Sequence, residues 1–159
     1  MVASGVIEQA GAVLLVENLR RHGARDWSTP GGVVEIGEDP LVGLTREVAE
    51  ETGLAVSLWS EPLYRVTTVA ADMGWHLDVV VHRALAWAGE VILGNDPDGI
   101  VVGAQFCAPE TLRERLQGTA QWVHEPMLAW ASDGWTGTRT FGYTVTGADR
   151  ATSTVTRTR

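Results

Sequence analysis

The chain has little of what several large protein classes need. It contains one cysteine, Cys107, so it cannot form an internal disulfide framework, and this composition suits a reducing cytoplasm. It also lacks long hydrophobic runs: the longest near the start, residues 12–16, is too short to span a bilayer. No positively charged segment precedes that run, as one would in a signal peptide. We therefore predict a cytoplasmic protein that has no membrane partner.

Positive charge is also scarce. Lys and Arg total 12 against 20 Asp and Glu, for a formal net charge of −8. This balance argues against binding to duplex nucleic acid, which requires a basic face. It does not argue against a small phosphate-bearing substrate, because a bound divalent metal can reverse the local sign of charge. No internal repeat is visible, and 159 residues with 45% apolar content suit one globular domain.

Several apolar stretches have the composition of β-strands. Residues 11–16 form a short run rich in β-branched side chains, which predicts a buried strand. Two longer stretches, residues 56–70 and 75–87, are joined by turn residues 72–74, and residues 100–107 predict a further strand. In the stretch 75–87, alternate residues predict one apolar face: Leu77, Val79 and Val81.

A helix is predicted over residues 39–52. Asp39 can cap its N-terminus, Pro40 suits the first helical position, and Gly53 suits the position just past the last turn. Three apolar residues are spaced to form one inward-facing stripe: Leu41, Leu44 and Val48. Two shorter helices are predicted to begin at Pro109, with Leu112 and Leu116, and at Pro126, with Met127, Leu128 and Trp130.

The last stretch, residues 136–159, differs in composition from the rest. It holds nine threonines and four arginines, while Phe141, Tyr143 and Val145 alternate with other residues. The pattern suits either a β-hairpin that turns near residues 147–150 or a partly disordered tail, and we favour the hairpin. We therefore divide the chain into a main domain, residues 1–135, and this C-terminal segment, which could also complete a homodimer.

Three glutamates of the predicted helix share one face. Glu47, Glu50 and Glu51 stand at positions i, i+3 and i+4, which are neighbours on a helix of 3.6 residues per turn. Their charges repel one another unless an oxygen-seeking cation such as Mg²⁺ lies between them. An acidic helix face is more often only a solvated surface, so these three residues alone do not establish a metal site.

The wider order of residues is far more specific. Gly32 is followed after five residues by Glu38, and after seven more by residues 46–54, Arg-Glu-Val-Ala-Glu-Glu-Thr-Gly-Leu. With residues near average usage, this order arises by chance about once in a billion start positions. It has every fixed position of the Nudix box, so the chain resembles the Nudix hydrolases. The similarity also includes Trp27 and residues 30–32, and extends more loosely over residues 7–131.

This resemblance implies an α/β fold of one domain, in which a mixed β-sheet is sandwiched between helices (α/β/α) and the box forms a loop–helix–loop. It implies hydrolysis of a nucleoside diphosphate linked to another group, with Mg²⁺ or Mn²⁺ as cofactor. It also implies that Glu38 and Arg46 form an ion pair that holds the loop against the helix. The implied metal ligands are the carbonyl of Gly32 and the side chains of Glu47, Glu50 and Glu51.

The pattern offers more than one candidate for the general base. Glu50 is near the middle of the acidic arc, so we expect it to activate the attacking water, although a loop carboxylate could do so instead. Many relatives carry a glutamate ahead of the second helix, where this chain has Gly99 or Ile100 and Gly103. Asp96 or Asp98 is the candidate replacement; the alternative is that both aspartates only form turns.

Other residues could contact the substrate. Three arginines of the loop before the two glycines are candidates for phosphate contacts, the alternative being a solvated loop: Arg20, Arg21 and Arg25. Three aromatic residues could stack on a base, although packing is their more usual role: Tyr64, Trp75 and Trp87. A second metal site could be formed by His76, Asp78 and His82, but we prefer to interpret them as ordinary polar positions of a sheet. We expect Cys107 to be a small buried hydrophobe.

Three functions are compatible with this fold. The first is a diphosphohydrolase, for which we slightly prefer nucleoside triphosphates in a housecleaning role over ADP-ribose, nucleotide sugars or dinucleoside polyphosphates. The second is a nucleotide-sensing Nudix module without turnover, which would be expected to have lost box glutamates. The third is an isopentenyl diphosphate isomerase, whose members usually depart from the box. Because the box is intact here, we favour the first.

Overall fold

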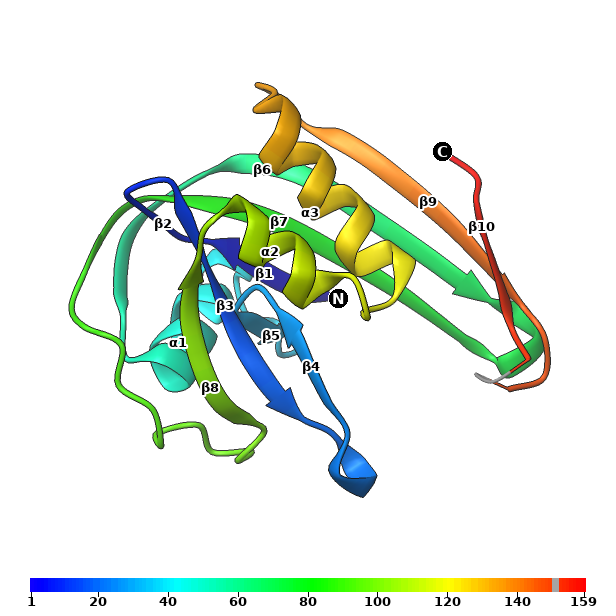
Figure 1. Cartoon of the computed structure of the whole chain (residues 1–159), viewed down its shortest axis with the longest axis horizontal. Coiled ribbons are helices and arrows are strands. Elements are labelled where there is room, and N and C mark those ends of the chain that lie inside the picture. The colour runs from blue at the N-terminus through cyan, green and yellow to red at the C-terminus, as the bar shows by residue number, and fades with distance from the viewer. Residues whose placement is uncertain (150–151) are drawn as a thin grey trace.

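Two β-sheets form the centre of the structure, a computed structural model that describes residues 1–149 and 152–159 (Figure 1). The larger sheet is mixed and has six strands in the order β10-β9-β6-β7-β1-β5. The β1–β7 and β6–β9 pairs are parallel and the others are antiparallel. The strands are β1 Val2–Val6, β5 Gly31–Val33, β6 Ala55–Ala70, β7 Trp75–Ala88, β9 Arg139–Thr146 and β10 Thr154–Arg157.

The smaller sheet is antiparallel and is centred on β3, Ala12–Leu19. Strand β8, Val101–Cys107, pairs with one edge of β3, and β2, Glu8–Gln9, and β4, Arg25–Ser28, pair with the other. The strands predicted over residues 11–16, 56–70, 75–87 and 100–107 are therefore confirmed, with small shifts of their bounds.

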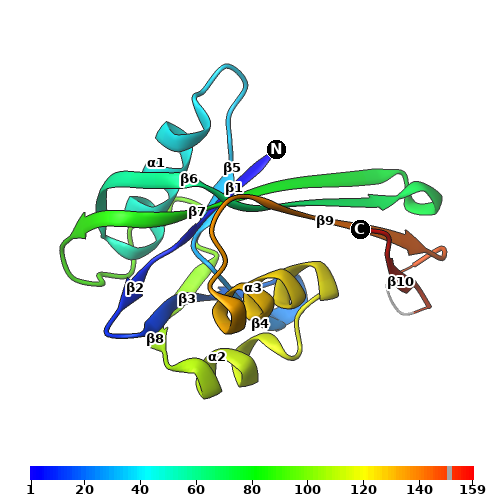
Figure 2. The same ribbon diagram turned by 90° about the horizontal axis from the view of Figure 1, so that it is seen from above.

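Three helices cover the sheets on two sides. Helix α1, Pro40–Thr52, packs against β1, β5 and β6 on one side, whereas α2, Pro109–Leu116, and α3, Gln121–Asp133, lie on the other (Figure 2). One buried cluster lies beneath α1 and includes Leu44 and Val48, and a second lies beneath α2 and α3 and includes Leu112 and Met127. The expected single-domain α/β/α arrangement is confirmed.

Both ends of α1 follow their sequence signals. The Asp39 side chain accepts hydrogen bonds from the backbone N–H groups of Leu41 and Val42, at 2.9 and 3.3 Å. Gly53 ends the helix with φ 74°, in the left-handed region, and its N–H bonds the Ala49 carbonyl. Leu44 and Val48 are fully buried, but the expectation for Leu41 was wrong, because it is 36% exposed. Leu41 and Val42 of the first turn are exposed, and the buried residues of the helix begin at Gly43.

Helix α3 begins five residues earlier than predicted, at Gln121 instead of Pro126. The backbone N–H groups of Val123 and His124 bond the Ala120 carbonyl, so the first turn forms ahead of the proline. Pro126 lies in the second turn, where its ring removes one helical hydrogen bond without ending the helix. Met127 and Trp130 are buried.

The C-terminal segment forms the predicted hairpin. Strand β10 pairs with β9, and β9 in turn lies parallel to β6 in the larger sheet. Phe141, Tyr143 and Val145 are all buried, the first two in the cluster beneath α2 and α3. Part of the predicted turn over residues 147–150 lies outside the described residues, because Arg150 is one of the two positions left out. The domain division after residue 135 stays a prediction.

Candidate active site

A cavity of about 530 Å³ is lined by both sheets, the C-terminal half of α1, the loop 96–100 and the first turn of α3. Its apolar wall comes from β6 and β7 and consists of Tyr64, Val66, Leu77, Val79 and Val81. Polar groups line other parts of it, among them Asn18, Arg20, Ser28, Glu47 and Glu51. A second cavity of about 290 Å³, beside α2 and α3, is lined by none of the box glutamates.

The backbone of Gly31, in β5, contacts the acidic helix. Its backbone N–H donates a hydrogen bond to Glu51 Oε2 at 2.8 Å. The β1–β5 pairing places Gly31 opposite Ser4, with φ 141°, and a Cβ there would lie 2.2 Å from the Ala3 carbonyl oxygen. Only glycine allows this approach of the two strands.

Gly32 is required for a different contact. A Cβ at this position would lie 2.4 Å from Glu47 Oε2. The missing side chain therefore leaves the space in which the Glu47 carboxylate lies against the backbone of β5. Gly32 and Glu47 both line the cavity.

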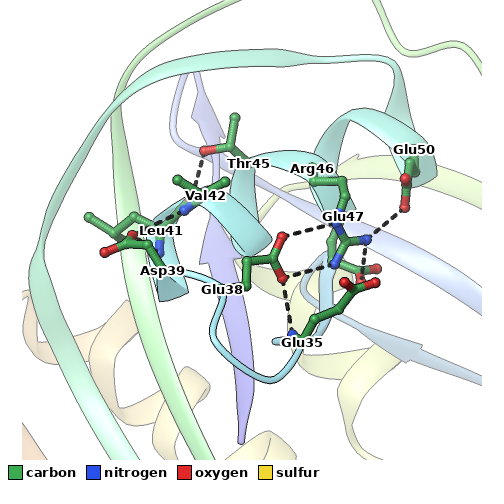
Figure 3. Close-up of polar contacts among 9 residues, drawn as sticks. All are labelled: Glu35, Glu38, Asp39, Leu41, Val42, Thr45, Arg46, Glu47 and Glu50. Atoms are coloured by element: carbon green, nitrogen blue, oxygen red, sulfur yellow. Dashed lines mark hydrogen bonds and ion pairs between the residues drawn. The ribbon is translucent and has the colours of Figure 1, made fainter.

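Arg46 connects the remaining acidic residues (Figure 3). Its Nη1 donates to Glu47 Oε1 at 2.9 Å and to Glu50 Oε2 at 3.1 Å. Its Nε and Nη2 donate to the two oxygens of Glu38, at 3.2 and 3.3 Å. Glu38 also accepts a hydrogen bond from the Glu35 backbone N–H at 3.0 Å. The structure thus has the predicted Glu38–Arg46 ion pair between the loop and the helix.

The surroundings shift the titration of these groups. Burial raises the pKa of Glu51 to about 8. The nearby acidic residues also raise this pKa, whereas the hydrogen bond from Gly31 lowers it. Burial also raises the pKa of Glu47, against the lowering effect of Arg46. The hydrogen bond from Arg46 lowers the pKa of Glu38, and the same pairing raises the pKa of Arg46. A buried carboxylate at Glu51 is therefore costly without a proton or a cation.

These residues fit a divalent cation by their chemistry. The candidate ligands are three carboxylates and the backbone carbonyl of Gly32. All of them bind through oxygen atoms, which Mg²⁺ and Mn²⁺ prefer. Within residues 1–149 and 152–159, no three acidic, His or Cys side chains converge closely enough to hold one ion. Glu47 and Glu50 turn toward Arg46, and Glu51 turns toward Gly31. For all three carboxylates to hold one ion, Glu47 and Glu50 would have to turn away from the Arg46 guanidinium.

The three candidate arginines do not lie together at the cavity. Arg20 lines it, and its Nε donates to Asp26 Oδ2 at 2.8 Å. Arg21 lies in the exposed 3₁₀ turn η1, Arg21–Gly23, and Arg25 pairs with Glu17 at 3.2 Å. Neither of these two lines the cavity, so the structure supports only Arg20 as a candidate.

Asp96 and Asp98 both line the cavity, but they are placed differently. The Asp96 carboxylate accepts hydrogen bonds from the backbone N–H groups of Asp98, Ile100 and Val101 and so organises the loop. The Asp98 side chain has no polar partner in the described part of the chain, and its charge contributes to the raised pKa of Glu47. Asp98 is therefore the better placed of the two to act on a ligand.

The aromatic candidates have mainly packing roles. Tyr64 is buried against Trp135 and Phe141 and forms part of the cavity wall, whereas Trp87 stacks on Phe106 outside it. Trp75 lies edge-to-face with Trp122, with ring centroids 5.9 Å apart. It is Trp122 that lines the cavity. Trp122 and Asn18 could not be predicted as cavity residues from the sequence, because neither belongs to a recognisable motif.

The possible second metal site is not formed. His76 Nε2 and Asp78 Oδ2 are 4.0 Å apart on the exposed face of β7. His82 is buried instead, and its Nδ1 lies 2.8 Å from the Ser60 carbonyl oxygen. These are ordinary sheet positions.

Cys107 is 1% exposed and packs in the cluster beneath α2 and α3, which confirms the expectation of a buried hydrophobe.

Comparison with known proteins gives a consistent result. A family model described as the NUDIX domain matches residues 1–131. A "Putative 8-oxo-dGTP diphosphatase 2" of Mycobacterium tuberculosis is 31% identical over 137 residues, which cover 78% of this chain and 95% of that protein. A "MutT-like protein" of Streptomyces ambofaciens is 42% identical over 57 residues, but only 36% of this chain and 35% of that protein are covered.

A solved structure is similar over much of the fold. The crystal structure of a MutT NUDIX hydrolase from Burkholderia pseudomallei superposes with a TM-score of 0.60 and 26% identity. The match covers 69% of this chain and 83% of that one.

Among the described helices, none combines the length and apolar character that crossing a bilayer requires.

Proposed function

The chain belongs to the Nudix hydrolase family, and on this premise we propose that it uses Mg²⁺ or Mn²⁺ to hydrolyse the diphosphate linkage of a nucleotide-type substrate. The observation that supports this proposal is that Glu47 and Glu51 line a cavity beside Gly31 and Gly32. Glu50 lies on the same helix and shares the Arg46 guanidinium with Glu47. We propose that the ion is held by these three glutamates together with the Gly32 carbonyl.

Each residue would have a separate part in the reaction. The bound ion would offset the charge of the two phosphates and acidify the attacking water. Glu50 would accept a proton from that water, and Asp98 is the alternative, because its carboxylate has no partner among the described residues. Glu38 would hold Arg46, and thereby the loop, in place against α1. The partly apolar cavity would exclude bulk water from the nucleoside.

Among substrates, we prefer a nucleoside triphosphate in a housecleaning role. The Mycobacterium relative, which covers most of the chain, has a name that refers to 8-oxo-dGTP. The cavity is also large enough for one nucleoside, since drug-sized ligand sites start at about 300 Å³. ADP-ribose, nucleotide sugars and dinucleoside polyphosphates are the alternatives within the same reaction class. The cytoplasmic location and a homodimer stay predictions.

The test is a screen of phosphate release over these four substrate groups, with Mg²⁺ and with Mn²⁺. We expect turnover of at least one nucleoside triphosphate that requires the metal. Glu50→Gln and Glu51→Gln should each lower kcat by about 100-fold or more while the circular dichroism spectrum is unchanged. The control is Glu61→Gln, an exposed residue away from the cavity.

Two outcomes would contradict the proposal. Tight nucleotide binding without turnover of any substrate would favour the non-catalytic sensor. Turnover that survives in well-folded Glu50→Gln and Glu51→Gln variants would remove these residues from the reaction. Preference for ADP-ribose or a nucleotide sugar would correct only the substrate.

A further inference from the structure

Asn18 is a buried polar residue in the wall of the cavity. It lies near the end of β3, is 5% exposed, and lines the same cavity as Glu47 and Glu51. Its Nδ2 donates to Asp26 Oδ1 at 3.1 Å and to Ser28 Oγ at 3.0 Å. Both donor hydrogens of the amide are therefore used by the neighbouring strand β4.

Asp26 determines which way the amide is turned. A carboxylate only accepts hydrogen bonds, so an amide turned the other way would place Oδ1 against another acceptor. The other Asp26 oxygen accepts from Arg20 Nε at 2.8 Å, which holds the carboxylate in place. The amide nitrogen of Asn18 therefore faces β4, and its oxygen faces away from β4.

The Asn18 oxygen is available to a ligand. It accepts no hydrogen bond from the described residues, yet it is not an enclosed atom. In the described part of the chain, the enclosed side-chain oxygens without a partner are Thr68 Oγ1 and Tyr143 Oη. Asn18 Oδ1 thus reaches open space, and the space that Asn18 lines is the cavity.

Two donors accompany this acceptor. The Ser28 hydroxyl accepts from Asn18 Nδ2, so its own hydrogen is free to donate. Arg20 uses Nε for Asp26, and its terminal nitrogens have no partner in the described part of the chain. Ser28 and Arg20 also line the cavity. The wall therefore offers one fixed acceptor and two donors.

We propose that this group selects nucleobases with a lactam edge, in which a ring N–H stands beside a carbonyl. Guanine, hypoxanthine, uracil and thymine have such an edge. The ring N–H would donate to Asn18 Oδ1, and the carbonyl, with two lone pairs, would accept from Ser28 and Arg20. The usual pairing of an asparagine with adenine uses both its oxygen and its nitrogen, and here the nitrogen is already used.

This proposal rests on the proposed function for its ligand class, and it adds Asn18 as a specificity residue and Asp26 as a positioning residue. The test is calorimetric binding of nucleoside monophosphates, which have no diphosphate link and report on the base separately from hydrolysis. Two matched pairs differ mainly in the edge that we propose is read: IMP against AMP, and UMP against CMP. We expect IMP and UMP to bind at least about tenfold more tightly than their partners.

Three variants make the test specific. Asn18→Leu, similar in size but without the acceptor, should bring both affinity ratios close to one. Asp26→Asn should lower the ratios partway, since it permits both orientations of the Asn18 amide, and it tests the idea even if Asn18→Leu does not fold. The control is Asp78→Asn, because Asp78 accepts from Thr67 across two strands in the same way but lies on an exposed face. Its ratios should equal those of the wild type.

Equal affinities within each pair, no binding of any of the four, or ratios unchanged in both Asn18→Leu and Asp26→Asn would overturn the proposal. Selective binding of IMP and UMP without hydrolysis of any triphosphate would contradict the proposed function and leave the base selection standing.

Discussion

Gly31 and Gly32 are neighbours in the chain, but each is glycine for a different reason. At Gly31 a Cβ would meet backbone, the Ala3 carbonyl oxygen at 2.2 Å, and φ is 141°. At Gly32 it would meet the flexible end of Glu47, at 2.4 Å. The first glycine allows the strand pairing, and the second allows the position of a proposed metal ligand.

The two alanine variants should therefore fail in different ways. Gly31→Ala should lower Tm strongly, because neither backbone can move without breaking the β1–β5 pairing. Gly32→Ala should leave Tm within a few degrees of the wild type but weaken Mn²⁺ binding and turnover, because the Glu47 carboxylate is displaced. Thermal melts and Mn²⁺ titrations of both variants are the measurements. A Gly32→Ala protein with normal Mn²⁺ affinity would contradict this account of Gly32.

Glu51 should make stability depend on pH. Its pKa is raised from 4.5 to about 8 on folding, so the folded state binds this proton more tightly than the unfolded state. The stabilisation is complete below about pH 4.5 and is lost as pH rises to about 8. We predict that Tm without divalent metal falls over this range, and that Glu51→Gln reduces the fall. Melts of Glu61→Gln are the control; a Glu51→Gln profile identical to wild type would refute the prediction.

Among the elements, α1 is the one whose ends depend most on local chemistry. The Asp39 side chain bonds two free N–H groups of the first turn, and Gly53 takes the left-handed conformation that ends the helix. Neither interaction depends on distant parts of the chain. The helix that carries the proposed metal ligands was therefore predicted from the sequence almost to the residue.

Removing the cap should destabilise the protein by a modest amount. Asp39→Ala leaves the N–H groups of Leu41 and Val42 without their side-chain acceptor, at a cost of about 1 kcal/mol. Urea unfolding measures the change. The control is Glu90→Ala, an exposed residue for which the structure gives no polar contact in its described part. A loss no larger than the control would mean that the cap contributes nothing.

Other elements could not be predicted because their signals depend on tertiary contacts. Strand β1 contains Ala3, Ser4 and Gly5, which do not show strand alternation. Gly5 has no side chain because another group comes close: a Cβ there would lie 2.7 Å from the Trp59 ring. The same applies to the cavity, where Asn18 and Trp122 come from distant segments and no local pattern joins them to the box.

At the scale of the whole molecule, the C-terminal hairpin is part of the main sheet. Strand β9 pairs with β6, which also supplies the cavity wall residues Tyr64 and Val66. The Phe141 ring lies 5.9 Å from Tyr64 and 6.1 Å from Trp135, centroid to centroid. Strand β9 therefore contacts β6 and Tyr64, which form part of the wall of the proposed site, although residues 136–159 lie beyond the matched family region.

Phe141→Ala should therefore reduce stability by about 3–5 kcal/mol, the usual cost of removing a buried aromatic ring. Denaturant unfolding measures it, and Thr140→Ala, an exposed neighbour on the same strand, is the control. A loss of less than about 1 kcal/mol, comparable to a surface substitution, would show that the hairpin is only loosely attached.

The central claim is that three glutamates of α1 jointly hold a divalent cation at the cavity, and a titration with Mn²⁺ followed by electron paramagnetic resonance tests it most directly. The wild type should bind Mn²⁺ in the presence of a nucleotide. Glu47→Gln, Glu50→Gln and Glu51→Gln should each weaken binding by about tenfold or more, whereas Glu61→Gln should not. Unchanged Mn²⁺ affinity in all three variants, with their folds intact, would contradict the account.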